Sequence, residues 1–327
     1  MASYKEIFGT NIEVLASDPA NPVQGQVWYN STSNVVKGQG ATTVGAWATG
    51  GNMNTGREQV AGSGTKDASL AFGGYVTANV GNTESYNGAS WTEVNDLNSA
   101  TRSIGSFGSQ TSAIAAGGNP PNAKNESWNG TSWTELADLN TARSASKGVG
   151  ADNTLGLVYG GYTTTNVAVN ESWNGTSWTE LNDLNTARAS LGGAGTATAA
   201  LAFNGGPQAN VGPAIYNTES WNGTSWTTLP ATTNTAAEGT GSNGSQTSAI
   251  VFGGSIYAGS GPNARTELWN GSAWTETTDL STGRSTLGSG SGGNNTSAIG
   301  FGGSGNTNAT EEWTGPGSPL TVTFTDS

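Results

Sequence analysis

Short apolar runs alternate with glycine, serine, threonine and asparagine along most of the chain, and one eight-residue pattern organises them. Glu-Ser-Trp-Asn-Gly-Thr-Ser-Trp occupies residues 126–133, 171–178 and 219–226, with looser copies at 84–91 and 267–274. Asn-Gly between two β-forming runs favours a type I′ turn, because Asn and Gly readily adopt the positive φ that both central residues need. Each copy therefore predicts a β-hairpin.

In the four copies that carry two tryptophans, both are predicted to lie on one face of the hairpin. If Asn174 and Gly175 form a two-residue loop, Trp173 pairs with Thr176, and Trp178 lies two residues further along the same strand. Side chains two residues apart in a strand share a face. A lone ribbon with two indoles on one side needs a packing neighbour in water, which a repeat supplies. We assign blade packing to Trp47, Trp91, Trp128, Trp133, Trp173, Trp178, Trp221, Trp226, Trp269, Trp274 and Trp313.

Six Gly-Gly pairs, each ending an apolar run, set the period of the repeat. They begin at residues 73, 117, 160, 205, 253 and 302, at intervals of 44, 43, 45, 48 and 49. A period in the forties with four short strands per unit is typical of β-propeller blades. The strand of Trp47 lacks a preceding half-unit, and the unit of Trp313 lacks a following tryptophan strand. The sequence predicts an all-β, six-bladed propeller over residues 41–315, with the N-terminal strand completing the last blade.

Residues 1–40 carry no copy of the repeat and predict a separate anchoring segment. Their apolar side chains suit docking on another protein, although packing on the main body is the alternative. Residues 26–30 and 34–37 predict a small hairpin. Residues 316–327 predict a C-terminal strand or tail, and 320–324 alternate like a further strand that is a candidate partner of this hairpin. The candidate anchoring residues are Tyr4, Ile7, Phe8, Ile12, Val14, Leu15, Trp28 and Tyr29.

Composition and charge narrow the classes of partner. The 327 residues include 51 glycines, 12 tryptophans, no cysteine and no histidine, and the formal net charge is -12. This acidic balance argues against nucleic acids or anionic membranes as main partners. The N-terminus lacks the apolar core of a signal peptide, and no stretch has the length of a membrane span. We therefore expect synthesis in a cytoplasm, with any outside role reached by assembly or lysis.

The segment Asp138-Leu-Asn-Thr-Ala-Arg-Ser144, followed by Val158-Tyr-Gly-Gly161, shows an order of arginine, apolar run and Gly-Gly. With the tryptophan strands that follow, this order resembles the kelch repeat over about residues 45–315. The resemblance implies that the arginine packs between blades and that the next residue faces the mouth of the central channel. The hairpin with two tryptophans departs from the usual kelch spacing, so kelch partners are not implied.

A second resemblance lies near the N-terminus. Residues 18–30, Asp-Pro-Ala-Asn-Pro-Val-Gln-Gly-Gln-Val-Trp-Tyr-Asn, together with Val35-Val-Lys37, are similar to segments in tail fibres and other virion proteins of tailed bacteriophages. It implies that residues 1–40 attach to another virion protein.

We predict no catalytic site, no metal and no cofactor. Galactose-oxidase-like kelch enzymes need histidine ligands and a cysteine–tyrosine crosslink, and both residue types are absent. Calcium held by Asp and Asn side chains is an alternative, although no loop has a known calcium spacing. Arginines recur after the tryptophan strands, and aspartates precede four of them: Arg57, Arg102, Arg143, Arg188 and Arg284, with Asp96, Asp138, Asp183 and Asp279. We predict structural Arg–Asp bracing, with a sialidase-like anion site as the alternative.

The loops after the Gly-Gly pairs differ most among the copies. Loops on a rigid scaffold commonly carry recognition, and the kelch resemblance places these on the usual ligand face. Neutral variation of surface loops is the alternative. The candidate binding residues are Tyr75, Pro120, Pro121, Tyr162, Tyr216, Ile256, Tyr257 and Arg265.

Taken together, these features predict a non-enzymatic virion protein of a tailed phage, a tail fibre or similar appendage. Residues 1–40 would hold it on the particle, and the propeller loops would contact a host-surface glycan or protein, in multiple copies. The alternatives are a decoration or structural protein without a receptor role, a cytoplasmic kelch scaffold, and a glycan-active enzyme.

Overall fold

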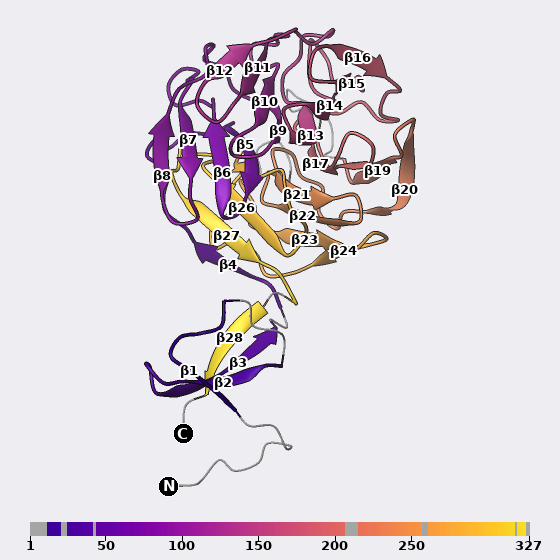
Figure 1. Ribbon diagram of the computed structural model, residues 1–327. Helices are drawn as coiled ribbons and strands as arrows, with labels where there is room; N and C mark the ends of the chain where they lie inside the picture. Colours follow the sequence, from indigo (N-terminus) through magenta and orange to yellow (C-terminus); the bar gives the residue numbers. More distant parts are fainter. Residues whose placement is uncertain are drawn as a thin grey trace. The chain divides into compact units, whose positions relative to one another are not determined.

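A computed structural model describes residues 12–20, 25–41, 44–206, 215–256, 261–317 and 319–324. Within these residues the protein is all-β: it has no helix and forms seven four-stranded sheets (Figure 1). The chain divides into two compact units, residues 1–45 with 315–327 and residues 46–314.

The small unit is one sheet with strand order β1-β2-β3-β28. Its strands are β1 (Glu13–Leu15), β2 (Val27–Asn30), β3 (Val35–Ala41) and β28 (Pro319–Phe324). β1 runs parallel to β2, and the other pairs are antiparallel. The predicted hairpin is β2–β3, and the predicted C-terminal strand pairs with it as β28.

A carboxylate fixes the segment between β1 and β2. Asp18 accepts hydrogen bonds from Trp28 Nε1, Asn30 Nδ2 and Lys37 Nζ, at 3.1, 2.7 and 2.6 Å. The bond from Lys37, with smaller contributions from Asn30 and Trp28, lowers the pKa of Asp18 to about 2. Trp28 is fully buried, so its side chain is part of this sheet's packing and does not offer a docking surface.

The other candidate anchoring residues differ in exposure. Val14 is 66% exposed, whereas Ile12, Leu15 and Tyr29 are partly buried. Tyr4, Ile7 and Phe8 lie outside the described residues.

The larger unit contains the six remaining sheets, five of which use four consecutive strands. Sheet 1 has β5 (Ala61–Thr65), β6 (Ala68–Phe72), β7 (Thr83–Tyr86) and β8 (Trp91–Val94). Sheet 2 has β9 (Gly105–Gly108), β10 (Ala113–Ala116), β11 (Asn125–Trp128) and β12 (Trp133–Glu135). Sheet 3 has β13 (Lys147–Asp152), β14 (Leu155–Tyr159), β15 (Asn170–Trp173) and β16 (Trp178–Leu181).

Sheets 4 and 5 repeat this order, and sheet 6 differs from it. Sheet 4 has β17 (Gly192–Gly195), β18 (Ala200–Phe203), β19 (Asn217–Trp221) and β20 (Trp226–Thr232). Sheet 5 has β21 (Gly241–Ser245), β22 (Ser248–Phe252), β23 (Thr266–Trp269) and β24 (Trp274–Glu276). Sheet 6 has β25 (Gly288–Ser289), β26 (Ser297–Phe301), β27 (Thr310–Thr314) and β4 (Ala46–Thr49).

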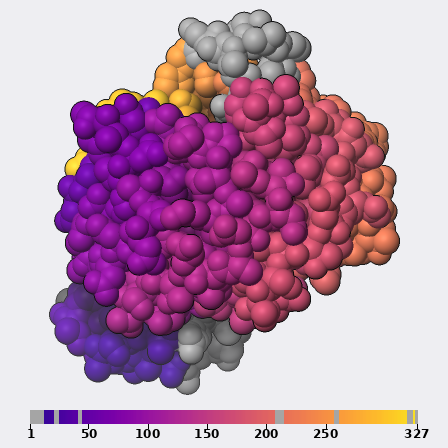
Figure 2. Space-filling view, turned by 90° about the horizontal axis from the view of Figure 1, so that it is seen from above, coloured from indigo at the N-terminus to yellow at the C-terminus, as the bar shows by residue number. Residues whose placement is uncertain are grey.

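Sheet 6 therefore combines strands from both ends of this unit. β4 pairs antiparallel with β27, and Trp47 lies opposite Trp313, as predicted for the N-terminal tryptophan strand. The first strands of successive sheets contact one another in turn, and β25 also contacts β5. Figure 1 shows the first strands β5, β9, β13, β17 and β21 towards the centre of the unit, and Figure 2 shows the repeats following one another from purple through magenta to orange. The arrangement is propeller-like.

The structure corrects the predicted hairpin loop. Trp173 pairs directly with Trp178, not with Thr176, so the loop has four residues, 174–177. The Asn174 side-chain oxygen accepts hydrogen bonds from the backbone N–H groups of Thr176 and Ser177, both at 2.9 Å. This local bonding favours a longer turn than the two-residue type. The two indoles still share a face, with ring centroids 5.2 Å apart.

The tryptophan in the fourth strand of each sheet packs against the neighbouring sheet. Trp133 of sheet 2 packs against Phe72 of sheet 1, with ring centroids 4.8 Å apart, and donates from Nε1 to Thr83 Oγ1 at 3.1 Å. The same aromatic contact recurs between every pair of successive sheets, including Trp91 of sheet 1 against Phe301 of sheet 6. The intersheet core is therefore built from edge-to-face and tilted rings, which suit aromatic quadrupoles.

Replacing Thr83 by valine tests the indole hydrogen bond. The change keeps the side-chain shape but leaves the buried Trp133 N–H without an acceptor, so we expect the free energy of unfolding to fall by about 1–2 kcal/mol. Denaturant unfolding measures it. The control is Thr92→Val, on the exposed side of β8, which should change stability by less than about 0.5 kcal/mol.

Candidate binding pocket

Six equivalent residues, one before the first strand of each sheet, are linked by backbone hydrogen bonds. Each N–H donates to the carbonyl of the preceding repeat, and Gln59 donates to Thr286, so the six bonds form a cycle with N···O distances of 2.7–3.0 Å. All six residues have φ between 53° and 63°, which is the left-handed region and disfavours residues other than glycine. We call them the inner ring: Gln59, Ser103, Ala145, Ser190, Gly239 and Thr286.

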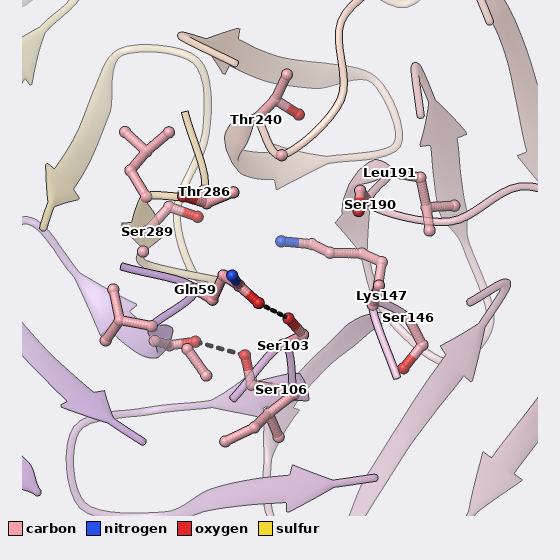
Figure 3. A pocket seen from close by; sticks show the side chains of 18 residues that line it. Gln59, Ser103, Ser106, Ser146, Lys147, Ser190, Leu191, Thr240, Thr286 and Ser289 are labelled. Atoms are coloured by element: carbon pink, nitrogen blue, oxygen red, sulfur yellow. Dashed lines mark hydrogen bonds between the residues drawn. The ribbon is translucent and has the colours of Figure 1, made fainter. Parts of the chain in front are cut away.

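The inner ring borders a pocket of about 110 Å³. Hydroxyl groups line much of it, among them those of Ser106, Ser146, Thr240 and Ser289 (Figure 3). Lys147 is the only charged residue among the described residues that line the pocket. Figure 3 shows its ammonium pointing into the middle of the space between the labelled side chains.

Lys147 stands at a position where the other repeats have alanine or glycine. It is the first residue of β13, and its counterparts are Ala61, Gly105, Gly192, Gly241 and Gly288. A Cβ at Gly241 would overlap the ring of Phe252. In sheet 3 the residue paired with Lys147 is Tyr159, whose hydroxyl donates to Leu201 O in sheet 4 at 2.7 Å. One repeat therefore carries a long cationic side chain where the other five carry only a methyl group or a hydrogen atom.

The lining combines one cation with several hydroxyl groups, which is a chemistry suited to anions. Burial lowers the pKa of the Lys147 ammonium from 10.5 to about 8. The group is therefore mostly charged at neutral pH, and its pKa lies close to that range. Within the described part of the chain Lys147 forms no ion pair. A carboxylate, sulfate or phosphate entering the pocket would meet one cation and several hydroxyl donors. Lys147 was not among the residues predicted from the sequence, although a lysine among alanine and glycine counterparts is a usable signal.

The predicted binding loops begin beside this pocket. Tyr75 and Tyr162, the first residues after two Gly-Gly pairs, bridge to Glu58 and Ser144, each of which directly precedes an inner-ring residue. Asparagines join neighbouring loops: Asn79 Nδ2 donates to Asn119 O at 2.6 Å, Asn166 Nδ2 to Gly206 O at 3.0 Å, and Asn306 Nδ2 to Val76 O at 3.1 Å. These bonds join three of the six pairs of neighbouring loops.

The candidate loop residues differ in exposure. Tyr216 and Ile256 are 48% and 39% exposed. Pro120 and Pro121 are exposed, whereas Tyr75 and Tyr162 are partly buried. Tyr257 lies outside the described residues.

The prediction that the arginines pair with aspartates is wrong. Arg57, Arg143, Arg188 and Arg284 pair with strand glutamates, not aspartates, at 2.6–2.9 Å, and both partners are almost completely buried. The partners are Glu84, Glu171, Glu219 and Glu311, the first residues of the repeated pattern or their equivalents in sheets 1 and 6. The glutamate also accepts backbone N–H groups of the connector that enters its sheet, as Glu171 does from Asn140 and Thr141.

The aspartates hold strand ends instead. Asp96, Asp183 and Asp279 accept hydrogen bonds from the backbone N–H groups of the residues just before the strand glutamates, at 3.1–3.3 Å. For Asp138 no arginine partner is found among the described residues.

Arg102 does not stand where the other four arginines stand. Gly74 N donates to Thr101 O, as Gly118 N does to Arg143 O, so Thr101 occupies the arginine position. Arg102 lies one residue later, and its guanidinium covers the ring of Tyr75, 4.4 Å from the centroid. This is a cation–π contact at the base of a candidate binding loop.

No family model matches the chain, and no curated protein is found to be similar to it. Among the described residues, no three acidic side chains lie close enough together to hold a metal ion. The same residues contain no helix that could cross a membrane.

The buried ion pairs predict a large effect of neutralising one partner. In Glu171→Gln, Arg143 keeps its charge inside the protein without a carboxylate, so we expect the free energy of unfolding to fall by about 3–5 kcal/mol. The control is Glu180→Gln, an exposed residue directly opposite on β16, which should cost less than about 1 kcal/mol. Equal losses in chemical denaturation would contradict the assignment.

Lys147 predicts a pH dependence of stability. Because its folded-state pKa is lowered to about 8, the unfolded chain binds a proton that the folded chain lacks between about pH 8 and 10.5. Raising the pH through this window should therefore stabilise the wild type relative to Lys147→Met, by on the order of 2 kcal/mol. The comparison of the two proteins cancels the tyrosines, which titrate at high pH in both. A constant difference from pH 7 to 11 would contradict it.

Proposed function

We propose that the larger unit is a six-bladed, kelch-like β-propeller in which β4 completes the last blade. Two cyclic patterns support this: the six inner-ring hydrogen bonds, and the aromatic contacts that continue from sheet 6 back to sheet 1. The buried arginines support the kelch resemblance, although their partners are strand glutamates. Such a ring would hold its loops in fixed relative positions.

On this scaffold, the protein is a non-enzymatic recognition protein of a tailed-phage particle, a tail fibre or similar appendage that contacts the host surface. The observation that carries the recognition role is the pocket with Lys147, surrounded by the bases of the loops that vary most among the repeats. The virion role rests on the resemblance of residues 18–30 to tail-fibre segments. Acidic groups of host-surface glycans or proteins suit the lone ammonium and its hydroxyl neighbours.

Several features favour binding over catalysis in the pocket. Among the described lining residues, no carboxylate or second amine stands beside Lys147 to act as its acid or base partner. The lining is otherwise hydroxyl, amide and small apolar groups. Weak binding by one pocket suffices when a particle carries many copies, because the copies multiply their effective affinity.

A binding experiment tests the recognition role. Fluorescently labelled full-length protein is mixed with cells on which the encoding phage grows. We expect the wild type to bind and Lys147→Met to bind about tenfold less, because a charge-assisted contact is lost. Lys66→Met, at the turn of the β5–β6 hairpin, removes the same charge elsewhere and should bind like the wild type.

Mass spectrometry of purified particles separates the alternatives. Presence of the chain in particles without binding to cells would indicate a decoration or structural role. Absence from particles would overturn the virion assignment and favour a cytoplasmic scaffold.

A further inference from the structure

The six strand glutamates share one environment, but only four have a buried arginine. Glu84, Glu126, Glu171, Glu219, Glu267 and Glu311 are all at most 5% exposed. The arginine position is occupied by Thr101 in the second repeat and by Ala237 in the fifth, as the equivalent backbone bonds from Gly74 N and Gly205 N show. The chain thus contains its own comparison between occupied and unoccupied glutamates.

The third repeat shows what the occupied place requires. Arg143 Nη1 donates to Glu171 Oε1 at 2.6 Å, and Nη2 donates to Val158 O at 2.9 Å. The same Oε1 also accepts the Thr141 N–H at 3.2 Å. One carboxylate oxygen and one strand carbonyl, with a longer bond of 3.5 Å to Thr141 O, therefore hold a fully buried guanidinium.

The second repeat keeps the same arrangement of carboxylate and connector but has no guanidinium beside it. Glu126 accepts the N–H groups of Asn98 and Ser99 as Glu171 accepts those of Asn140 and Thr141, but it forms no ion pair in the described part of the chain. Where the side chain of Arg143 lies in the third repeat, the second has a cavity of about 200 Å³. Its lining includes Thr101, Ala115, Pro120, Asn122, Lys124 and Glu126, and Ala115 is the counterpart of Val158. The side-chain oxygen of Thr101 is buried and has no hydrogen-bond partner.

In the fifth repeat the equivalent place is smaller and is lined by an exposed arginine that forms no ion pair with Glu267 in the described part of the chain. Arg265, two residues before Glu267, donates from Nη1 to Thr235 Oγ1 at 2.8 Å, and the remaining cavity is only about 10 Å³. Lys124 stands at the same position before Glu126, but its shorter, single ammonium is bound to Ser99 Oγ at 2.7 Å and lies 3.7 Å from Glu135. It lines the cavity and leaves it open.

We propose that this cavity is a binding site for an alkylguanidinium group, such as the side chain of arginine. The guanidinium would occupy the place of the Arg143 guanidinium and donate to Glu126 Oε1 and Ala115 O, its alkyl chain leaving between Pro120 and Lys124. A planar guanidinium suits a carboxylate and carbonyl fixed at this spacing better than a single ammonium does. The site is separate from the Lys147 pocket and does not depend on the proposed function.

Titration of the full-length protein with ethylguanidinium, followed by calorimetry, tests the proposal. We expect millimolar affinity or better for the wild type, and no binding of ethylurea, which has a similar shape without the charge. Free L-arginine and an arginine in a blocked tripeptide form two further arms. Equal binding of both would identify an arginine side chain of a partner protein as the occupant. Preference for free L-arginine would identify a small metabolite as the occupant.

Variants locate the binding. Thr101→Arg supplies the missing side chain and should weaken ethylguanidinium binding at least about tenfold while raising the melting temperature; Thr101→Val keeps the cavity and should bind within about threefold of the wild type. Glu126→Gln should lose binding, whereas Glu135→Gln, the exposed residue opposite it, should keep it. Lys124→Gln removes a repelling charge and should strengthen binding. No binding by the wild type, or unchanged binding by Thr101→Arg, would overturn the proposal.

Discussion

The architecture of the larger unit depends on carboxylates buried where strands and connectors meet. Each strand glutamate accepts at least one backbone N–H from the connector that enters its sheet, as Glu84 does from Asn54 and Glu311 from Ser281. A carboxylate taken out of water needs such donors, and connectors need acceptors for their own N–H groups. The bond between glutamate and connector satisfies both groups, and each connector, fixed in this way, continues into an inner-ring residue. The pocket and the loop bases take their positions from there.

Much of the fold could be predicted from the sequence because it repeats. The number of tryptophan hairpins, the common face of their indoles and the pairing of Trp47 with Trp313 all follow from pattern and spacing. The predicted loop length was wrong because the prediction rested on the backbone angles of a type I′ turn alone. In the structure, the side-chain oxygen of Asn174 also accepts two backbone hydrogen bonds. Here a polar side chain decides between two turns that the Asn-Gly pair allows.

The errors at the candidate sites have a different origin. Arginine was assigned to nearby aspartates because they are close in sequence, but its partner, such as Glu171 for Arg143, is supplied by a strand 28 residues away. Arg102 looked equivalent to Arg143, yet one residue of displacement turns it from the glutamate to the ring of Tyr75. Long-range pairing cannot be read from composition or spacing, whereas the displacement of Arg102 is present in the sequence, because Arg102 follows Asp96 by six residues and Arg143 follows Asp138 by five. Lys147 and Thr101 stand out only when aligned repeats are compared position by position.

The sixth sheet has a consequence for biosynthesis. β4 emerges from the ribosome early, whereas its partner β27 is more than two hundred residues later in the chain. During that interval the β4 strand has no native neighbour, and its backbone groups form an open edge of the kind that invites misassembly. The unit can therefore complete its tertiary structure only near the end of translation, which makes premature termination especially damaging.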